Sequence, residues 1–586
     1  LNLGLRWQYY QPPYEANGFQ AAQNVDIDEL FAKRVANGAA GIGGDSAEPF
    51  LVYDLIGKAN DGRPLYHPDK NNFSPRIGFA YAPSFDSGIG KFLFGDRKTS
   101  IRGGGSILYE RTSGALTFIQ DQVTYLFDNS ASTLFGAPTA TEALLNDPRF
   151  SSINSVPVQN VPPVITRPFT PFVAGGVPFG NAEGQTNYTV SENFETPYYY
   201  QYSLGVQREL PGNMLVDISY VGRLGRKLFT QADAAQIVDF KDPASGQTLL
   251  QALNAIQAGS AAVQPFFENQ GALALGVPCS AVGIGTCTDF IAANLGSLIA
   301  IGDASDTVQA LNSIGLLRNN IGLSGQFSTN AYVGNLGHSR YDGLLVSLQK
   351  RFVNGFQFDV NYTYSFSKDN NSSVGNTVFG GLICDLRDLN ACYGPSDFDI
   401  RHLFNANGIW DLPFGKGRWI GRDSSSLVDA LIGGWQISGI VTARSGLPFS
   451  TTTGSFPVGF VFNSPGVLTG DASALTGKID ATGSNITFFA DQAAALAAFK
   501  NPRNGEIGVR NNLRGPAFWN VDLSLAKNFK LPWESQRIQI RVDAFNALNQ
   551  NFFALPNANI NSSSFGFITG SASAPRELQF AARYDF

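Results

Sequence analysis

The chain has 586 residues, and 15% of them are charged, against roughly 25% in a typical soluble protein. Its formal net charge of −6 argues against a nucleic-acid-binding protein, whose contact surface is usually strongly basic, so we expect no nucleic-acid partner. No apolar run reaches ~18 residues, which argues against a membrane-spanning helix. The chain begins at Leu1 without a charged-then-apolar leader, so we expect either that a leader and more have been removed or that the chain is a fragment.

Strict alternation of apolar and polar residues is the main pattern of the sequence. Between Phe356 and Ser367 every second residue is apolar and the residues between them are polar. Because successive side chains of a strand point to opposite faces, such a segment has one apolar and one polar side. We expect twelve strands of this kind, at residues 1–10, 75–83, 99–110, 198–210, 214–222, 341–352, 356–368, 401–412, 435–445, 518–529, 536–548 and 576–586.

The length of these segments favours strands that cross a membrane. They run over 9–13 residues, whereas strands of soluble proteins average ~5–6 and a tilted membrane strand needs ~9–11. Aromatic residues such as Trp410, Trp435 and Tyr584 lie near the segment ends. Outer-membrane barrels carry aromatic girdles at the same places.

The connections between the segments alternate between short and long. Short or intermediate ones lie at residues 84–98, 211–213, 353–355, 413–434 and 530–535, and long ones near 11–74, 111–197, 223–340, 369–400, 446–517 and 549–575. Outer-membrane barrels have short periplasmic turns and long extracellular loops. The sequence therefore predicts an all-β, antiparallel transmembrane barrel in a Gram-negative outer membrane, with a periplasmic C-terminus.

Short amphipathic helices are expected within the long loops. The candidate segments are residues 26–35, 139–145, 249–258, 306–316 and 491–499, with a further one at 424–431 on the short-turn side. Asp306 and Asp491 are the residues that we expect to cap two of them, since a carboxylate accepts a hydrogen bond from the first turn.

The four cysteines fall in two close pairs, Cys279 with Cys287 and Cys384 with Cys392. Local pairing would close two small loops, as expected of disulfides in an oxidising compartment. Free thiols and a metal site are the alternatives, and sequence alone cannot choose among the three possible pairings. Because CxxC or Cys/His spacing is absent and the three histidines are scattered, we expect no metal site.

No catalytic motif stands out, so we expect neither an enzyme nor a cofactor. HExxH, the phosphate-binding GxxxxGK[ST] and the GxSxG nucleophile elbow are all missing from the sequence. The triplet at residues 103–105 is glycine-only, but it lies inside a strand pattern, where glycine usually marks a bend. Aspartates near the second cysteine pair lack the spacing of a calcium loop.

Charged residues on the polar face of the last three segments are the candidate site: Asp522, Arg537, Arg541, Asp543, Glu577, Arg583 and Asp585. They either form ion pairs that line the barrel or contact an internal plug or a passing solute. We predict that Asp522 lies opposite Arg541, because a shift by two residues would set Asp522 against Asp543, a repulsive pair.

Several of these segments resemble those of Oar-like TonB-dependent outer-membrane transporters. The matching stretches include YYYQYSLGVQRELPGNMLVDISYVG at 198–222 and SRYDGLLVSLQKRFVNGFQFDVNYTYSFSKD at 339–369, besides 72–81, 99–111, 396–418, 433–448 and 538–553. The resemblance implies a 22-strand barrel, an N-terminal plug and a segment that contacts TonB. Residues 1–586 would then be the C-terminal part of the barrel, with about twelve strands and neither the plug nor the regulatory domain.

The resemblance also implies partners and a function. The alternating chain end resembles the signal read by the barrel-assembly machinery, which would fall on Phe580, Tyr584 and Phe586. The other implied partners are outer-membrane lipid, the TonB complex through the missing N-terminal part, and a substrate that the sequence does not identify. The implied function is energised passage of a large substrate across the outer membrane. A passive porin or export channel is the alternative, and a secreted β-rich adhesin is a third class.

Overall fold

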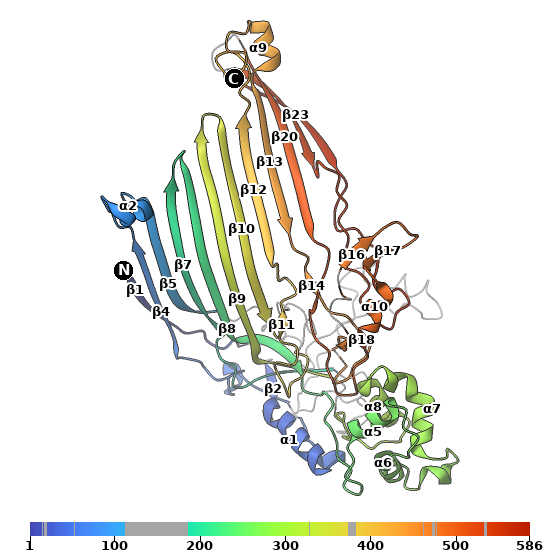
Figure 1. Ribbon diagram of the computed structural model, residues 1–586. Helices are drawn as coiled ribbons and strands as arrows, with labels where there is room; N and C mark the ends of the chain where they lie inside the picture. The colour runs from blue at the N-terminus through green and yellow to red at the C-terminus, as the bar shows by residue number, and fades with distance from the viewer. Residues whose placement is uncertain are drawn as a thin grey trace, which may run out of the picture.

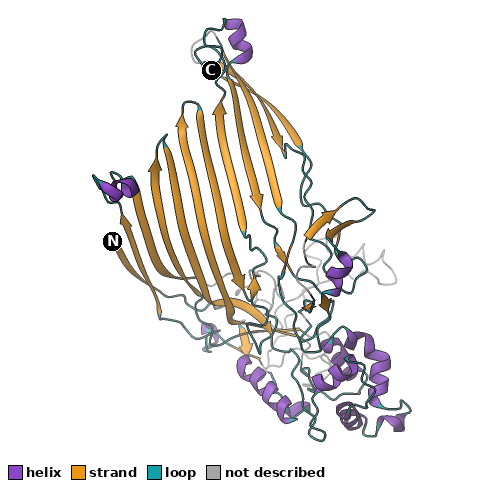
Figure 2. Ribbon diagram, viewed as in Figure 1, coloured by secondary structure: helices purple, strands orange, loops and turns teal. Residues whose placement is uncertain are grey.

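The structure is a computed structural model that describes residues 1–111 and 186–586, except residues 15, 17–19, 52, 327–328, 373–382, 461, 471–474, 476 and 532–535. Its largest element is one tall, curved sheet, with the long loops and most of the helices gathered at one end (Figures 1 and 2). Along the main path of this sheet, each strand pairs with its neighbour in antiparallel orientation.

All twelve predicted strands are present, and they pair in chain order. In that order they are β1 (Asn2–Gln8), β4 (Asn72–Tyr81), β5 (Thr99–Tyr109), β7 (Tyr198–Leu210), β8 (Met214–Asp233), β9 (Thr329–Val353), β10 (Phe356–Asp369), β12 (His402–Asp411), β13 (Trp435–Arg444), β20 (Phe518–Lys530), β21 (Arg537–Phe545) and β23 (Glu577–Asp585). Within the described residues, β1 and β23 each pair with one strand only and are the two edges of the sheet.

Two strands are much longer than predicted. β8 has 20 residues and β9 has 25, and their far ends pair with each other beyond the segments that alternate. Residues 230–235 and 329–334 are buried there. Tyr332 packs in one apolar cluster with residues of α1 (Ile27–Ala40), and its neighbour Val333 packs in another with residues 21–22 and 190. An additional strand, β6 (Thr186–Val190), runs parallel to β9 along this extension, and β11 (Gly394–Pro395) pairs with the end of β10.

The short and long connections lie at opposite rims of the sheet, as predicted (Figure 1). We call them the short-turn rim and the long-loop rim. The short-turn rim carries α2 (Gly88–Phe94) and α9 (Ser426–Ile432). The long-loop rim carries α1 (Ile27–Ala40), α5 (Leu249–Gln257), α6 (Pro265–Leu275), α7 (Cys287–Ala300), α8 (Ala304–Ser313) and α10 (Gln492–Ala497). Both ends of the chain lie towards the short-turn rim (Figure 1).

Five of the six expected helices are confirmed, and the sixth, at residues 139–145, lies outside the described residues. Asp491 caps α10 as predicted, with its side chain accepting from the amide of Ala494 at 2.9 Å. The assignment of Asp306 as a cap is wrong. The helix begins at Ala304, two residues before the predicted segment at 306–316, and Asp303 is its cap. Asp303 Oδ1 accepts from the amide of Asp306 at 3.1 Å.

Short strand pairs complete the long-loop rim: β2 (Ala21–Gln23) with β3 (Tyr53–Leu55), β14 (Pro448–Phe449) with β19 (Leu513–Arg514), β15 (Val467–Leu468) with β18 (Phe499–Lys500), and β17 (Ile486–Phe489) with β16 (Gly477–Asp480) and β22 (Phe567–Ile568). The four buried apolar clusters of the described residues all lie at this rim, and the largest of them is formed by α5–α8 and the segments around them. Among the described helices, none has the length and apolar character of a membrane span.

Candidate functional site

The two faces of the sheet differ in chemistry, as the alternation predicts. On one face, which we call the outer face, large apolar side chains are exposed on strand after strand, among them Leu3, Leu5, Ile77, Leu204, Leu523 and Phe580. Phe358, Val360 and Tyr362 of β10 are half-buried and belong to no buried cluster. An apolar surface of this extent on a soluble monomer would be unusual.

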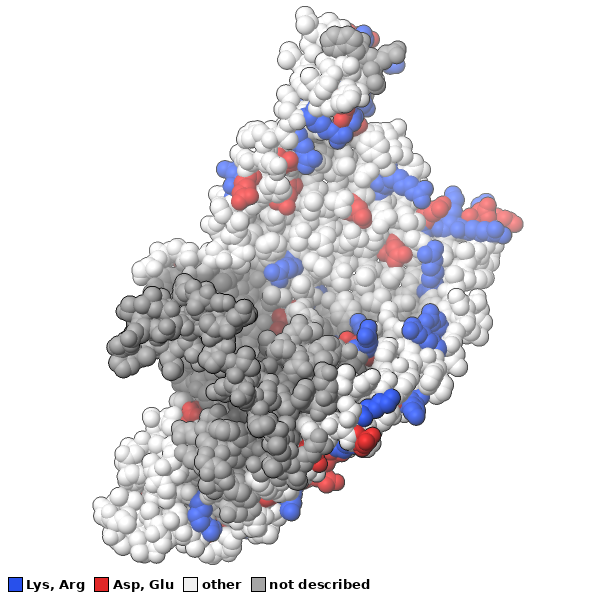
Figure 3. Space-filling model, turned by 180° about the vertical axis from the view of Figure 1, so that it is seen from behind, with Lys and Arg blue, Asp and Glu red and all other residues white. Residues whose placement is uncertain are grey.

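The opposite face, the inner face, is polar. Figure 3 shows charged side chains spread over one face of the sheet, between the two rims. At the C-terminal edge the predicted residues pair locally: Arg537 Nε lies 2.5 Å from Asp585 Oδ2 directly across the strand pair, and Arg583 Nε lies 2.6 Å from the other oxygen of Asp585. Glu577 lies opposite Phe545, at the start of β23.

The predicted pairing of Asp522 with Arg541 is wrong. Ser524 lies opposite Asp543 and Ala526 opposite Arg541, so β21 is shifted by four residues from the predicted register. The register follows from the turn, which places Lys530 opposite Arg537, and one exposed ion pair contributes only about 0.2–1 kcal/mol. Arg541 bonds instead to Asp543, two residues along its own strand, with Nε 2.7 Å from Oδ1.

A hollow of about 400 Å³ brings three predicted residues together on the inner face. Asp522, Arg541 and Asp543 line it, together with polar residues of β12 and β13 such as Asn407 and Ser438. Asp522 Oδ1 accepts from the backbone amide of Asn546 at 2.8 Å and thereby holds the end of β21. The hollow can offer both charge signs to a solute or to a protein segment inside the curve of the sheet.

A cluster of ion pairs at the long-loop rim was missed by sequence reasoning. Arg510 donates to Asp369 Oδ1 and to Asp397 Oδ1, each at 2.9 Å, and Arg514 pairs with Asp399. Asp397 and Asp399 belong to the aspartates near the second cysteine pair, and Asp369 directly follows the predicted strand at 356–368. No spacing in the sequence links them to arginines more than 110 residues later, so the signal was absent.

The structure links Cys279 to Cys287 and Cys384 to Cys392, with Cα–Cα distances of 5.4 and 6.0 Å. The first disulfide ties α7 to the short 3₁₀ turn that follows α6. Glu268 lies close to its sulfur atoms, but its carboxylate accepts from the backbone amides of Cys287 and Thr288. That contact supplements the N-cap residue Thr286 at the first turn of α7. Because disulfide sulfurs do not serve as thiolate ligands, this group is not a metal site.

A buried polar group joins the end of β8 to α1. Arg34 of α1 donates to the carbonyl oxygens of Ala234 and Gln236, at 2.6 and 3.3 Å. Asp233 beside it is fully buried, and burial raises the pKa of its carboxyl group to about 6, although the amides of Asn330 and Ala235 lower it. This group lies at the long-loop rim, beyond the alternating part of β8.

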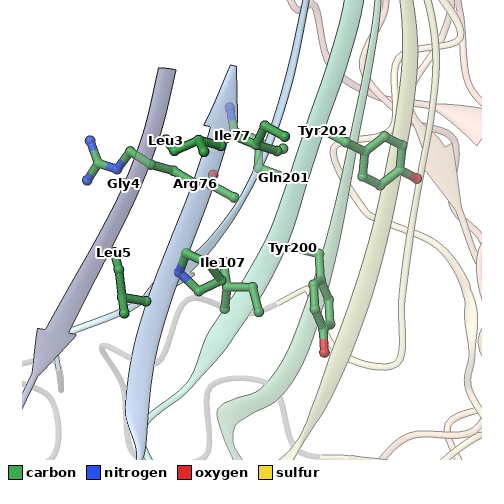
Figure 4. A pocket seen from close by; sticks show the side chains of 12 residues that line it. Leu3, Gly4, Leu5, Arg76, Ile77, Ile107, Tyr200, Gln201 and Tyr202 are labelled. Carbon is green, nitrogen blue, oxygen red and sulfur yellow. The ribbon is translucent and has the colours of Figure 1, made fainter. Parts of the chain in front are cut away.

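A second hollow, of about 680 Å³, lies on the outer face near the edge strand β1. Figure 4 shows Leu3, Leu5, Ile77, Ile107 and Tyr200 at this hollow, on neighbouring strands. Its apolar side chains belong to the same set that the alternation places outside. We therefore assign this hollow to the outer apolar surface and not to a solute site.

A tall antiparallel sheet with an apolar outer face, a polar inner face and loops at one rim has the architecture of a membrane β-barrel wall. The family comparison agrees: the model of the outer membrane beta barrel domain matches residues 1–579, and the chain belongs to this family. Its place is accordingly the outer membrane of a Gram-negative bacterium. No curated protein matches the chain.

Solved structures of outer-membrane transporters are similar over part of their length. The transporter YddB from Escherichia coli matches with a TM-score of 0.38 and 9% identity, over 91% of this chain and 42% of YddB. The siderophore receptor PiuA from Acinetobacter baumannii matches with a TM-score of 0.33 and 7% identity, over 91% of this chain and 39% of PiuA. The ferripyoverdine receptor of Pseudomonas aeruginosa matches with a TM-score of 0.32 and 8% identity, over 92% of this chain and 35% of the receptor. The chain thus spans less than half the length of these proteins.

Proposed function

We propose that the chain forms the wall of an Oar-like, TonB-dependent outer-membrane transporter, through which a large solute crosses the membrane. One observation carries this proposal: the exposed apolar outer face and the charged inner face are built from alternate residues of the same long strands. A secreted adhesin would bury its apolar side chains, whereas Leu5, Leu204 and Phe580 are exposed.

The orientation follows from the two rims. In outer-membrane barrels the short turns are periplasmic and the long loops are extracellular, so the short-turn rim and the C-terminus would face the periplasm. Phe580, Tyr584 and Phe586 at the exposed end of β23 are the residues that we propose for recognition by the barrel-assembly machinery.

The edges of the sheet need partners in lipid. An unpaired strand edge leaves backbone amides and carbonyls without hydrogen bonds in the hydrocarbon layer, which is not tolerated. We therefore propose that β1 and β23 pair in the membrane, with further strands of a larger barrel of about 22 strands or, in a smaller barrel, with each other. The charged inner face would then enclose a plug or a passing solute.

A strain comparison tests the dependence on TonB. Cells lacking this gene and cells lacking TonB are grown in the same medium, and the consumption of dissolved compounds is measured. We expect each compound that cells lacking the gene fail to consume to remain unconsumed by cells lacking TonB as well. A compound whose uptake needs the gene but not TonB would contradict the proposal and favour a passive porin.

A planar bilayer experiment with the purified full-length protein separates the same alternatives. A porin gives steady conductance steps, whereas a barrel closed by a plug gives none until the plug is displaced. Steady steps from the intact protein would favour the porin.

A further inference from the structure

Two short helices at the short-turn rim expose apolar side chains to an unusual degree. In α2, Ile89 is 78% exposed and Phe92 is 76% exposed. In the segment of α9, Leu427 is 83% exposed and Trp419, in the turn before the helix, is 86% exposed. A connection at this rim needs only a few residues, so the two helices are not required to join the strands. Because their apolar side chains are exposed, we expect another surface to cover them.

The C-terminal end of α9 is held against the outer face of the sheet. Lys527 of β20 lies directly opposite Trp435 of β13, and both belong to the alternating set that includes Leu525. The Lys527 ammonium group donates to the carbonyl oxygen of Leu431 at 3.2 Å and to that of Gly433. Trp435 Nε1 also donates to the carbonyl oxygen of Leu431, at 2.9 Å.

The same arrangement recurs at α2. Arg208 of β7 lies on the outer face, in the alternating set of Leu204 and Val206, and its guanidinium group donates to the carbonyl oxygens of Phe92, at 2.6 Å, and Leu93. The hydroxyl group of Thr99, directly opposite Arg208 in the register, donates to Leu93 at 2.8 Å. The last carbonyls of a helix lack partners within the helix and carry partial negative charge, so a cation suits them.

The two contacts supply hydrogen bonds to cations that lie on the lipid-facing side of the sheet. A cation on the outer face near lipid is costly unless other groups supply hydrogen bonds. In each case the carbonyls at the end of a folded-back helix supply them. The helix lies at the short-turn rim, and its exposed apolar residues continue the outer face beyond the strand ends (Figure 1).

We propose that α2 and α9 are interfacial anchors that insert Ile89, Phe92, Trp419 and Leu427 into the headgroup–acyl boundary of the leaflet at the short-turn rim. The occupant is a phospholipid surface. Continuity with the outer apolar face supports it, because that face meets lipid in this family. Exposed cations beside the helices, among them Lys91, Lys416 and Arg422, suit lipid phosphates.

The test uses nitroxide labels on the full-length protein in vesicles of phosphatidylethanolamine and phosphatidylglycerol. The four cysteines of this chain are in disulfides, so they do not compete for the label with a cysteine introduced into it. The variants are Ile89→Cys and Leu427→Cys, and the matched control is Leu273→Cys, an exposed position on α6 at the long-loop rim. We expect labels at the first two positions to collide more with oxygen, which dissolves in lipid, than with a water-soluble nickel chelate, and the control label to show the opposite.

The outcomes separate the possible occupants. Nickel accessibility at Ile89 and Leu427 equal to that of the control would overturn the proposal, and spin–spin broadening between copies would replace lipid with a second copy of the chain. Lys527→Gln should raise the nickel accessibility of the label at Leu427 and leave that at Ile89 unchanged. Arg208→Gln should raise the nickel accessibility of the label at Ile89 and leave that at Leu427 unchanged. An unchanged label in both cases would show that the cations do not hold the helices.

Discussion

Arg34 and Glu48 form an ion pair that is sealed inside the long-loop rim, with Nε 3.0 Å from Oε2 and side chains 3% and 0% exposed. The guanidinium group also binds backbone carbonyls at the end of β8, while Glu48 Oε1 accepts from the hydroxyl group of Ser324 at 2.7 Å. The pair therefore joins α1, the segment after it and the extension of β8. Its partners are far apart in the sequence, and their contact fixes how the loops are stacked.

Removing one member of this pair should loosen the long-loop rim. We expect Arg34→Met to lower the local free energy of unfolding by about 3–5 kcal/mol, because Glu48 is left as a buried, unpaired charge. Hydrogen exchange of the α1 amides measures this loss. Lys33→Met is the matched control, since Lys33 is the exposed neighbour on the same helix. Equal exchange in the two variants would show that the buried pair contributes nothing.

Asp233 should make the same region more stable at mildly acidic pH. Burial raises the pKa of its carboxyl group from 3.8 to about 6. The folded state therefore binds the proton more tightly than the unfolded state, so this group lowers stability as pH rises from about 4 to 6. The full effect is about 3 kcal/mol at ~1.4 kcal/mol per pKa unit. The local free energy of unfolding, from hydrogen exchange corrected for the intrinsic rate, measures it.

Asp233→Asn is the variant that isolates this group, because it keeps the oxygen that accepts from the amides of Ala235 and Asn330. Its stability should change less between pH 7 and pH 4.5 than that of the wild type. Burial also raises the pKa of the Asp303 carboxyl group to about 6. Asp303 therefore changes stability with pH in the same direction and accounts for the pH dependence that remains in Asp233→Asn. A slope unaffected by Asp233→Asn would contradict the assignment.

The strands of the sheet were predictable because lipid on one side and water on the other impose alternation on every residue. The ends of β8 and β9 were not, since residues 331–333 are all buried there, and Tyr332 and Val333 pack in separate apolar clusters. α6 and α7 escaped prediction for a related reason: they pack among other helices, and their apolar residues lack a clear one-sided pattern.

The candidate site was predictable as a set of residues but not as a set of contacts. Alternation placed Asp522, Arg541 and Asp543 on one face, and the structure places all three around one hollow. Their pairing depends on the register, which the turn and a row of backbone hydrogen bonds determine more strongly than any single ion pair. The arginines of the rim cluster meet aspartates across the fold, which no local pattern encodes.

The disulfide between Cys279 and Cys287 should stabilise α6 and α7 without affecting the sheet. Replacing both cysteines with serine should cost about 2–3 kcal/mol, from the loop-closure entropy of a short loop. Hydrogen exchange should rise in α6 and α7 and stay unchanged in β12 and β13. An increase in both regions would show that the loops and the sheet unfold together.

Gly271 gives a second test of the same packing. A Cβ atom at this position would lie 2.5 Å from Cys287 Sγ and 3.2 Å from Cys279 Sγ, so α6 can approach the disulfide only with glycine there. We expect Gly271→Ala to lower the local stability of α6, as measured by exchange of its amides. Gly296→Ala in α7 is the control, because a Cβ atom there meets nothing within 4 Å.

Asp522 should act on the backbone of Asn546 and not on Arg541. Asp522→Ala removes the acceptor of the Asn546 amide, and we expect a local loss of about 1–3 kcal/mol, seen as faster exchange of that amide. Asp522→Asn keeps an acceptor oxygen and should lose less.

A double-mutant cycle tests the register behind this prediction. The cycle between Asp522→Ala and Arg541→Ala should give a coupling near zero, because Arg541 lies opposite Ala526 and bonds to Asp543. The cycle between Arg541→Ala and Asp543→Ala should give a measurable coupling, since these side chains share an ion pair 2.7 Å long. Strong coupling between Asp522 and Arg541, with none between Arg541 and Asp543, would mean that β21 is shifted by four residues from the register in the structure.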